Sequence, residues 1–419
     1  MSSQVVELSS SAPTRNPVRF GTSALREVLD AIRDSAAAAK REGRSLHSTI
    51  DLVRASRLGA LRVPVAEGGG GASVREYYAM LMDLAEADAD VAHILRAHYW
   101  FVEDRLRSQN KAERARWLAK VVDGEIFGNA MSEIGGGAAV GSWLFNTTLT
   151  PNERGFVLNG TKYYCTGSLY ADWVNVFACN TDGAVVSAVI PVGREGFVLV
   201  DDWDGIGQRL TGSGTGTLNN VQVWPEEVLA AAVESTDAAS LSNPAEPYLA
   251  GQICQLILTA IIAGIMRNVV SDAIRLVRGR GRTYAHAAGD TPAADPLLQQ
   301  VVGQLASQAL ACEALVLAAA EAQEAAFNRA AQGPADLDLA HRGSLLAAQA
   351  KVVVDELASR AAAQLFDVGG SSAIKQSADL DRHWRNIRTL ASHNPVLYKA
   401  RAIGDYLING TSLPSNGFF

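Results

Sequence analysis

The feature that most constrains this fold is the order in which two hydrophobic periodicities follow one another along the chain. Over residues 23–122 apolar residues recur every three or four positions, which is the spacing of one face of a helix. Over residues 126–228 short runs rich in β-branched and aromatic residues replace that pattern. From residue 248 onward the helical spacing returns. Helices, then strands, then helices again is an uncommon order, and it narrows the possible folds sharply.

The middle region predicts a small β-barrel or sandwich, because several short strands follow one another closely. The runs with strand character are residues 156–164, 173–178, 185–191 and 196–200. Within the first run, Asn159 and Gly160 form a pair that is typical of a two-residue hairpin turn, so we expect the chain to reverse there.

The last region predicts a bundle of long helices. Residues 297–331 are very rich in alanine, and small side chains allow helices to pack closely. The most apolar run, residues 253–266, is shorter than a membrane span and contains Cys254, Gln255 and Thr259. We therefore expect a buried helix there and no membrane contact.

These changes of pattern divide the chain into four predicted parts. Residues 1–16 are a polar, disordered tail, and residues 17–125 form an N-terminal helical domain. Residues 126–235 form a middle β-domain, and residues 236–419 form a C-terminal four-helix bundle. The fold class is thus α+β with several domains.

Charge and cysteine usage exclude several functional classes. The net charge of −7 gives no electrostatic reason to expect nucleic acid or an anionic membrane as a partner. The four cysteines are far apart and form no Cys-x-x-Cys pair, so the sequence predicts neither a metal site nor a disulfide framework. The first residues lack the pattern of a signal peptide. We expect a cytoplasmic protein.

The segment with the most chemical interest is the turn formed by Ser392, His393, Asn394 and Pro395. The residue before a proline is disfavoured in helical geometry, so His393 and Asn394 should lie at a helix break. A histidine held at such a break can exchange a proton near neutral pH. A purely structural histidine is the alternative, and only its surroundings distinguish the two.

Five segments, in order and spacing, resemble the acyl-CoA dehydrogenase family over nearly the whole chain. They are residues 63–72, 131–137, 158–172, 207–210 and 221–225. The resemblance implies an N-terminal helical domain, a middle β-domain and a C-terminal four-helix bundle.

One departure from that family is informative. Its dehydrogenases use a carboxylate base, commonly in the last domain, but no acid occurs here between Trp384 and Arg401. Other members carry the base elsewhere, so this absence alone decides nothing. The turn at residues 392–395 and the segment before it resemble the flavin-dependent monooxygenase branch, especially the dibenzothiophene type. FAD-dependent acyl-CoA dehydrogenase is the first alternative, and a non-catalytic flavin-fold binding protein is the second.

The resemblance implies a mechanism in which reduced flavin and O2 form a C4a-hydroperoxide that oxygenates a small substrate, with sulfur favoured over nitrogen or aromatic carbon. His393 would lie beside the peroxide and supply or hold its proton. Thr166 would place a hydroxyl beside flavin N5, with Ser168 as the neighbouring alternative. Both hydroxyls could instead belong to an ordinary turn.

Further residues are implied to bind the cofactor. Asn129 and Ser132 would contact the edge of the isoalloxazine ring. Trp203 would flank the ring, or else belong to the core. Asn394 would bind the flavin or orient the histidine, with a helix cap as the equal alternative.

The cofactor phosphate has its own expected residues. Arg282 would reach it, often from a neighbouring subunit, because a guanidinium donates two parallel hydrogen bonds. Gly369 and Gly370 would approach it through backbone amides.

In the N-terminal domain the resemblance implies that His98 and Tyr99 line the substrate pocket, with a catalytic role for His98. His93 is the competing histidine.

No strand–Gly-x-Gly-x-x-Gly–helix unit is present, so we expect a separate NAD(P)H:flavin reductase to deliver reduced FMN, with FAD as the alternative. A homotetramer is expected, with a dimer as the alternative.

Overall fold

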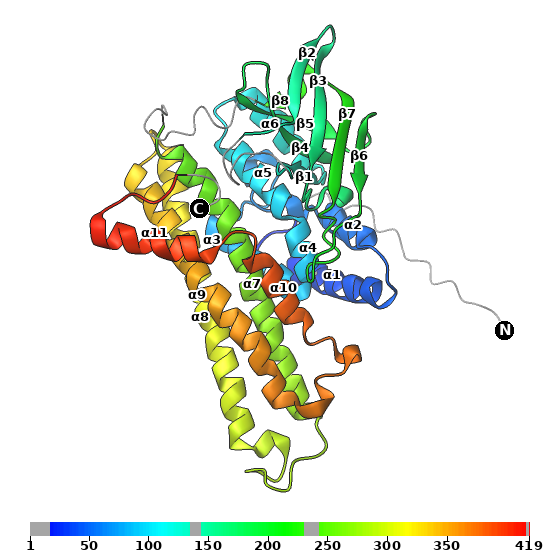
Figure 1. The fold of residues 1–419 in the computed structure, drawn as a ribbon, viewed down its shortest axis with the longest axis vertical. Helices are drawn as coiled ribbons and strands as arrows, with labels where there is room; N and C mark the ends of the chain where they lie inside the picture. The colour runs from blue at the N-terminus through cyan, green and yellow to red at the C-terminus, as the bar shows by residue number, and fades with distance from the viewer. Residues whose placement is uncertain (1–16, 135–143, 230–242, 416–418) are drawn as a thin grey trace, which may run out of the picture.

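A computed structural model of the chain describes residues 17–134, 144–229, 243–415 and 419. Helices come first, a sheet follows between Phe127 and Leu229, and long helices complete the chain (Figure 1). The order expected from the sequence, and with it the fold class, is confirmed. The expected polar tail, residues 1–16, lies outside the described residues.

The N-terminal helices begin where the sequence provides caps. The Thr22 side chain accepts a hydrogen bond from the Leu25 N–H at the start of the first helix. Ser73 and Glu76 form a reciprocal capping box at the start of the third. The helices of this group are α1 (Ser23–Arg41), α2 (His47–Ser56), α3 (Val74–Ala87), α4 (Ala89–Ile94), α5 (Arg96–Arg107) and α6 (Lys111–Val122).

The middle region is one eight-stranded mixed sheet in the order β6-β7-β3-β2-β4-β5-β8, with β1 paired to β4. Residues from both halves of this order, such as Leu158, Val176, Ile190 and Leu218, share a single core cluster. The sheet therefore wraps around its own core, as expected of a small barrel or sandwich. The strands are β1 (Phe127–Ala130), β2 (Thr148–Asn152), β3 (Gly155–Lys162), β4 (Trp173–Cys179), β5 (Val185–Pro191), β6 (Phe197–Val200), β7 (Thr215–Val223) and β8 (Val228–Leu229).

The expected hairpin at Asn159 and Gly160 is wrong. Both residues lie inside β3, where the pairing with β7 shifts register between Leu158 and Gly160. The Asn159–Gly160 pair therefore marks a β-bulge. Like a hairpin turn, this bulge contains a glycine with positive φ. The chain reverses earlier, between Asn152 and Gly155.

Three long helices, α7 (Glu246–Gly279), α8 (Pro296–Ala331) and α9 (Leu337–Gly369), form the C-terminal bundle. Helix α10 (Arg382–Ala391) packs on α7 and α9, and α11 (Val396–Asn409) packs on α9. Helix α7 also packs against α3 of the first domain. At that crossing a Cβ on Gly264 would lie 2.5 Å from the Met82 carbonyl oxygen, so only glycine permits this approach.

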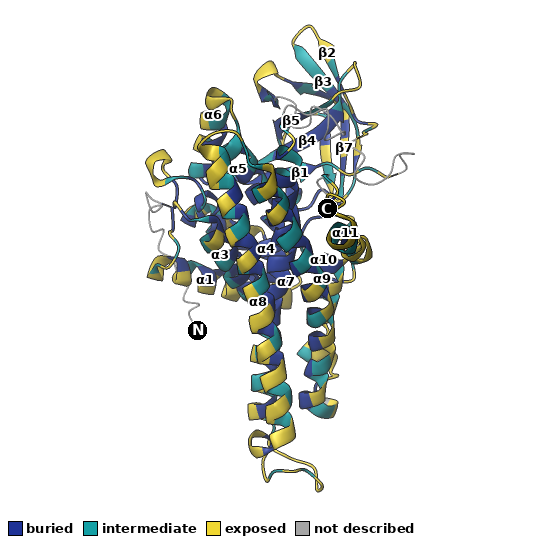
Figure 2. Ribbon diagram, turned by 90° about the vertical axis from the view of Figure 1, so that its left-hand side faces the viewer, coloured by how far each residue is buried: buried dark blue, intermediate teal, exposed yellow. Residues whose placement is uncertain are grey.

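Helices α7 and α8 are each long and apolar enough to cross a membrane. In α7 this apolar stretch is 94% buried inside the protein, and the dark colouring of the helix in Figure 2 shows it as the centre of the bundle. The sequence predicted a buried helix here but underestimated its length. In α8 only 22% of the stretch is buried, so much of this helix presents small apolar residues at the surface.

Candidate active site

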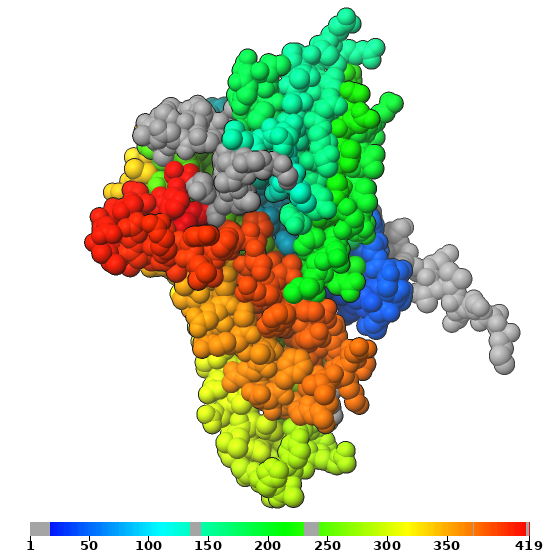
Figure 3. Space-filling view, in the orientation of Figure 1, coloured from blue at the N-terminus to red at the C-terminus, as the bar shows by residue number. Residues whose placement is uncertain are grey.

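A cavity of about 570 Å³ lies where the three groups of elements meet. Helices α4 and α5 form one wall, the sheet domain forms another, and α7 with the turn after α10 forms the third. On the face shown in Figure 3 the loop before β7 (green) covers the site against α10 (orange-red). The Gln208 N–H donates to Asn386 Oδ1 at 2.8 Å across this contact.

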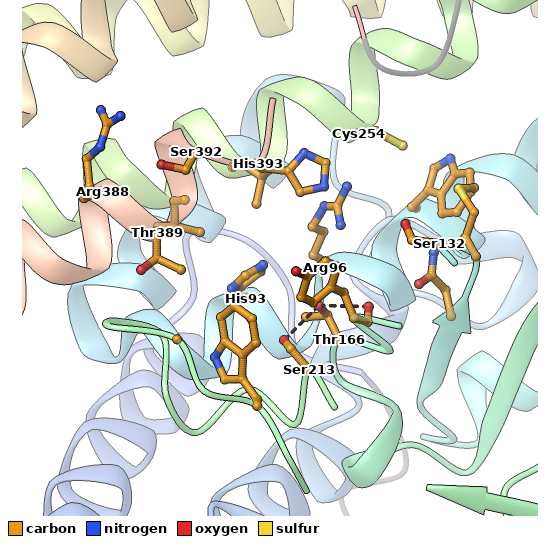
Figure 4. A pocket seen from close by; sticks show the side chains of 18 of the residues that line it. His93, Arg96, Ser132, Thr166, Ser213, Cys254, Arg388, Thr389, Ser392 and His393 are labelled. Atoms are coloured by element: carbon orange, nitrogen blue, oxygen red, sulfur yellow. Dashed lines mark hydrogen bonds between the residues drawn. The ribbon is translucent and has the colours of Figure 1, made fainter. Parts of the chain in front are cut away.

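On the sheet wall Thr166 belongs to a chain of buried hydroxyls with a fixed direction. Its Oγ1 lies 2.9 Å from Ser213 Oγ, which lies 2.7 Å from Thr211 Oγ1. The Gln208 carbonyl oxygen accepts from Thr211 Oγ1 at 2.9 Å and has no proton to give. With Thr211 donating to Gln208, Ser213 donates to Thr211, and the Thr166 proton goes to Ser213 or to the Tyr164 carbonyl oxygen at 3.5 Å. Thr166 is left to offer a hydrogen-bond acceptor to the cavity (Figure 4).

The backbone separates Thr166 from Ser168, the two alternative hydroxyls. Gly167 between them has a φ of 80°, and a Cβ there would lie 2.3 Å from the Ile94 carbonyl oxygen. Thr166 lines the cavity, whereas Ser168 is fully buried and donates to the Asn129 carbonyl oxygen at 3.1 Å. The expectation that Ser168 contacts a cofactor in this cavity is wrong, because its hydroxyl is used inside the sheet domain.

Three other expected cofactor residues, Asn129, Ser132 and Trp203, line the same cavity. The Trp203 indole N–H donates to the Gln208 carbonyl oxygen at 2.9 Å, which fixes the ring at the cavity wall. Within the described part of the chain, no hydrogen bond holds the side chains of Asn129 and Ser132. Their polar atoms are therefore available to a bound molecule.

His393 lies on the bundle side of the cavity, on the predicted turn between α10 and α11. The turn is anchored from both sides. The Asn394 side-chain amide donates to the Gln255 side chain on α7, and Lys351 Nζ donates to the Ala391 carbonyl oxygen at 3.1 Å. Asn394 is buried and does not line the cavity, so its place fits the positioning role better than a flavin contact.

The environment of His393 holds its imidazole neutral. His393 lines the cavity, and part of its surface is exposed. Desolvation of the ring lowers the pKa of His393 well below its usual value, and the positive charges of Arg96, Lys351 and Lys399, and of His93 when it is protonated, lower it further. A neutral imidazole offers one N–H donor and one acceptor.

The α4–α5 wall carries His93, Arg96 and Trp100, which are spaced by three and four residues. His93 is buried, and burial together with the charge of Arg96 lowers its pKa to about 3. The sequence reasoning named His93 only as an alternative and did not single out Arg96. Helical spacing could not have found both, because α4 ends at Ile94 and α5 begins at Arg96.

His98 and Tyr99 do not reach the cavity, so their expected pocket role is wrong. Nδ1 of His98 accepts from the Phe127 N–H at 3.2 Å, and Nε2 contacts the Gly59 carbonyl oxygen at 3.0 Å. The Tyr99 hydroxyl donates to the Leu58 carbonyl oxygen at 2.9 Å. Both side chains are fully buried, and they join the first domain to the start of the sheet. Because His98 lies outside the pocket, the structure does not support the catalytic role expected of it.

We expect His98→Leu to lower the free energy of unfolding by about 2–4 kcal/mol, because two buried backbone groups lose their partner. Urea unfolding measures this change, and His47→Leu, at an exposed position, is the control. The folded variant should keep its turnover number. Lost turnover at unchanged stability would restore His98 as a catalytic residue.

Glu133 is the one carboxylate that lines the cavity among the described residues. Burial alone would raise its pKa, but hydrogen bonds from Lys162, Thr147 and two backbone N–H groups outweigh burial and lower the pKa to about 2. Its Oε1 accepts from Lys162 Nζ at 2.7 Å and from Thr147 Oγ1 at 2.6 Å. A carboxylate so occupied is a poor proton acceptor, which matters for any dehydrogenase chemistry.

Family models and known proteins agree on the relationship of this chain. The acyl-CoA dehydrogenase N-terminal, middle and C-terminal domains match residues 20–125, 128–221 and 256–397. A dibenzothiophene monooxygenase of Mycolicibacterium goodii is 31% identical over 368 residues, covering 85% of this chain and 86% of the relative.

The chain belongs to the acyl-CoA dehydrogenase family.

Solved structures indicate to which branch of the family the chain belongs. TdsC, a dibenzothiophene monooxygenase of Paenibacillus sp. A11-2 solved with FMN and indole, superposes with a TM-score of 0.85 at 27% identity, covering 94% of this chain and 98% of TdsC. Methanesulfinate monooxygenase MsuC of Pseudomonas fluorescens gives 0.83 at 25% identity, with coverages of 94% and 98%. The expected resemblance is confirmed: this member of the acyl-CoA dehydrogenase family is an enzyme of the flavin-dependent monooxygenase branch.

The cavity residues fit the ring of a flavin, the cofactor of this branch of the acyl-CoA dehydrogenase family. Thr166 presents an acceptor, and Asn129 and Ser132 present unengaged polar groups, which suit the N–H and C=O groups along the polar edge of the ring. Trp203 supplies an aromatic surface nearby. Among the described residues of this wall, Glu133, which is paired with Lys162, carries the one formal charge.

The residues expected at the cofactor phosphate lie elsewhere. Arg282 is exposed in the loop that joins α7 to α8, at the end of the bundle away from the cavity (Figure 1). Gly369 and Gly370 lie at the same end, where Arg280 Nη1 donates to the Val368 carbonyl oxygen at 3.2 Å. Within one chain these residues do not reach the cavity of this family member. A phosphate contact through them requires a second subunit.

Proposed function

We propose that this enzyme takes reduced FMN from a separate NAD(P)H:flavin reductase and transfers one oxygen atom of O2 to the sulfur atom of a small organic molecule. One structural observation carries the proposal. The cavity places the neutral imidazole of His393 opposite the acceptor hydroxyl of Thr166, and Glu133, the one carboxylate of its described lining, is already occupied. The names of TdsC and MsuC, which refer to dibenzothiophene and methanesulfinate, support a sulfur substrate.

Reduced FMN supplies the two electrons needed to activate O2, so that one oxygen atom enters the substrate and the other leaves as water. The residues of the chain prepare the site for this. Thr166 accepts a hydrogen bond from an N–H of the bound ring and so orients it. His393 holds a proton on one ring nitrogen at the opposite wall and donates a hydrogen bond into the cavity. Met131, Ile206 and Leu258 supply apolar surface that excludes water.

A direct assay tests the proposal. The protein is mixed with a flavin reductase, NADH, FMN and 18O2, together with a neutral sulfide, a sulfoxide and a sulfinate. We expect 18O in the oxidised product only when both proteins are present. Turnover of acyl-CoA substrates with an artificial electron acceptor would instead identify an FAD-dependent dehydrogenase. An absence of affinity for flavin would identify a non-catalytic binding protein.

We also propose that the enzyme is a cytoplasmic homotetramer in which Arg282, Gly369 and Gly370 of one subunit approach the cofactor phosphate of another. The exposed, alanine-rich surface of α8 supports association between subunits, because small residues allow close helix packing. The position of Arg282 outside the cavity of its own chain supports a contact made in a neighbour. Light scattering measures the subunit number, with a dimer as the alternative.

A further inference from the structure

Arg96 differs from every comparable arginine of the described chain. It begins α5 and lines the cavity (Figure 4), and its Nε is buried with no hydrogen-bond acceptor. The described residues provide it with neither an ion pair nor a hydrogen bond. Arg105 and Arg107 also have a buried, unpartnered Nε, but Arg105 pairs with Glu113, and Arg107 pairs with Glu246 at 3.5 Å.

The same contrast holds for the other partly buried arginines of the core. Arg62 pairs with Glu103 at 2.5 Å, Arg194 with Glu227 at 2.6 Å, and Arg267 with Asp83 at 2.5 Å. A guanidinium keeps its charge in proteins, and a charge taken from water without a partner carries a large desolvation penalty. An arginine that bears this penalty beside a cavity is set up to bind an anion that enters the cavity.

The surrounding charges favour an anion as well. The charged groups that act on His393 most strongly are cationic: Arg96 on α5, His93 on α4 when protonated, Lys351 on α9 and Lys399 on α11. Lys351 is paired with Asp355 on the same helix at 2.6 Å, so Arg96 is the cation of this group that the described residues leave unpaired. From α7 the ionisable neighbour of Arg96 is Cys254, whose thiol stays protonated because burial raises its pKa to about 11. Glu133, the one acidic residue of the described lining, is paired with Lys162 at 2.7 Å. No carboxylate of the described lining is therefore left to neutralise Arg96.

We propose that Arg96 binds an anionic oxygen-bearing group of the substrate, so that the enzyme acts on organic sulfur compounds with a negatively charged end, such as sulfinates or sulfur-containing carboxylates. This inference rests on the proposed function and adds the substrate class. A guanidinium suits such groups because its fork donates two parallel hydrogen bonds to a pair of oxygens. Trp100, Met131 and Leu258 supply the apolar surface for the rest of the molecule.

A bound anion would also act on the two histidines beside Arg96. A negative charge stabilises the protonated form of an imidazole, so it raises the pKa of His393 and of His93 from their depressed values. Binding of the anion is therefore coupled to proton uptake. In this way the substrate would help to load the proton that the reaction uses.

The test uses benzenesulfonate, an anion whose sulfur is already fully oxidised, and methyl phenyl sulfone as its neutral counterpart. Calorimetric titration is done on the protein saturated with oxidised FMN and on the protein without FMN. We expect Arg96→Met to weaken sulfonate binding at least about tenfold and to change sulfone binding less than about threefold. Arg96→Lys should lie between the two. Titration in buffers of different ionisation enthalpy should show proton uptake with wild type and less with Arg96→Met.

The matched control is Arg342→Met, which removes the same charge from an exposed arginine outside the cavity lining. It should weaken sulfonate binding less than about threefold. Arg96→Met should fold normally, since it removes an unpaired charge. The inference is overturned if Arg96→Met binds sulfonate as wild type does. It is also overturned if FMN abolishes sulfonate binding, since Arg96 would then serve the flavin.

The two proposals fail in different ways. If the enzyme oxygenates neutral sulfides but does not bind sulfonate, the proposal of an anionic substrate is wrong and the proposed monooxygenase function stands. If sulfonate binding depends on Arg96 but no sulfur compound is oxygenated, the anion site stands and the proposed oxygenation of sulfur is wrong.

Discussion

His393→Gln is expected to lower the rate of substrate oxygenation by about 10²–10⁴-fold while oxidised FMN still binds. The imidazole lies on a turn that two helices hold in place: Gln255 of α7 accepts from Asn394, and Lys351 of α9 donates to the Ala391 carbonyl oxygen. Glutamine keeps a donor and an acceptor of similar reach but cannot exchange a proton near neutral pH. The change therefore removes proton handling and retains much of the hydrogen bonding.

The informative measurement is the ratio of product formed to O2 consumed. In His393→Gln the rate of product formation should fall far more than the rate of O2 consumption, because reduced flavin still reacts with O2. His47→Gln changes an exposed histidine outside the cavity and should keep the wild-type ratio. Wild-type turnover in His393→Gln would remove this residue from the mechanism.

Lys162→Met is expected to lower the free energy of unfolding by about 3–5 kcal/mol, the usual cost of leaving a buried charge without its partner. The Lys162 side chain is fully buried, Glu133 is 8% exposed, and their charged atoms lie 2.7 Å apart. Lys162 also donates to the Met131 carbonyl oxygen at 3.1 Å. The Lys162–Glu133 pair therefore holds in place the segment that includes Ser132, a residue of the cavity wall. Urea unfolding measures the loss.

The double variant Glu133→Gln with Lys162→Met is the matched control, because it removes both charges. It should be more stable than Lys162→Met alone. A double variant no more stable than the single one would show that lost packing, and not the stranded carboxylate, causes the effect.

The same pair predicts a pH dependence. The pKa of Glu133 lies at about 2 in the folded protein, below its ordinary value of 4.5. A depressed carboxyl pKa stabilises the fold above the ordinary value, and this contribution disappears as pH falls through the folded value. The stability difference between wild type and Glu133→Gln should therefore be constant above about pH 5 and shrink between pH 4.5 and pH 2. A difference that stays constant down to pH 2 would contradict the assigned ionisation.

Local signals in the sequence were sufficient for several parts of the site. The turn that holds His393 follows from Pro395, which ends α10 regardless of what surrounds it. The position of Thr166 at the end of a strand segment also followed from the sequence and its resemblance. The choice between Thr166 and Ser168 did not, because the positive φ of Gly167 directs their side chains to opposite sides.

The histidine on the α4–α5 wall was misassigned for a different reason. Helix α4 ends at Ile94 and α5 begins at Arg96, so a helical count that runs through both does not keep its phase. Packing of α5 against β1 then turns His98 into the core and leaves His93 and Arg96 at the cavity. The bulge at Asn159 and Gly160 likewise depends on the register with β7, a strand far along the chain.

The sequence by itself determined the order of helices, strands and helices, the break at Pro395 and the lack of an acid between Trp384 and Arg401. These features depend on periodicity and local backbone preference, which neighbouring residues largely set. Only the tertiary structure decided which polar side chains are already paired. It showed that Glu133 is occupied by Lys162 and that Arg96 has no carboxylate partner among the described residues. Pairing depends on residues distant in sequence, so the charge available to a substrate becomes visible only when the three domains meet.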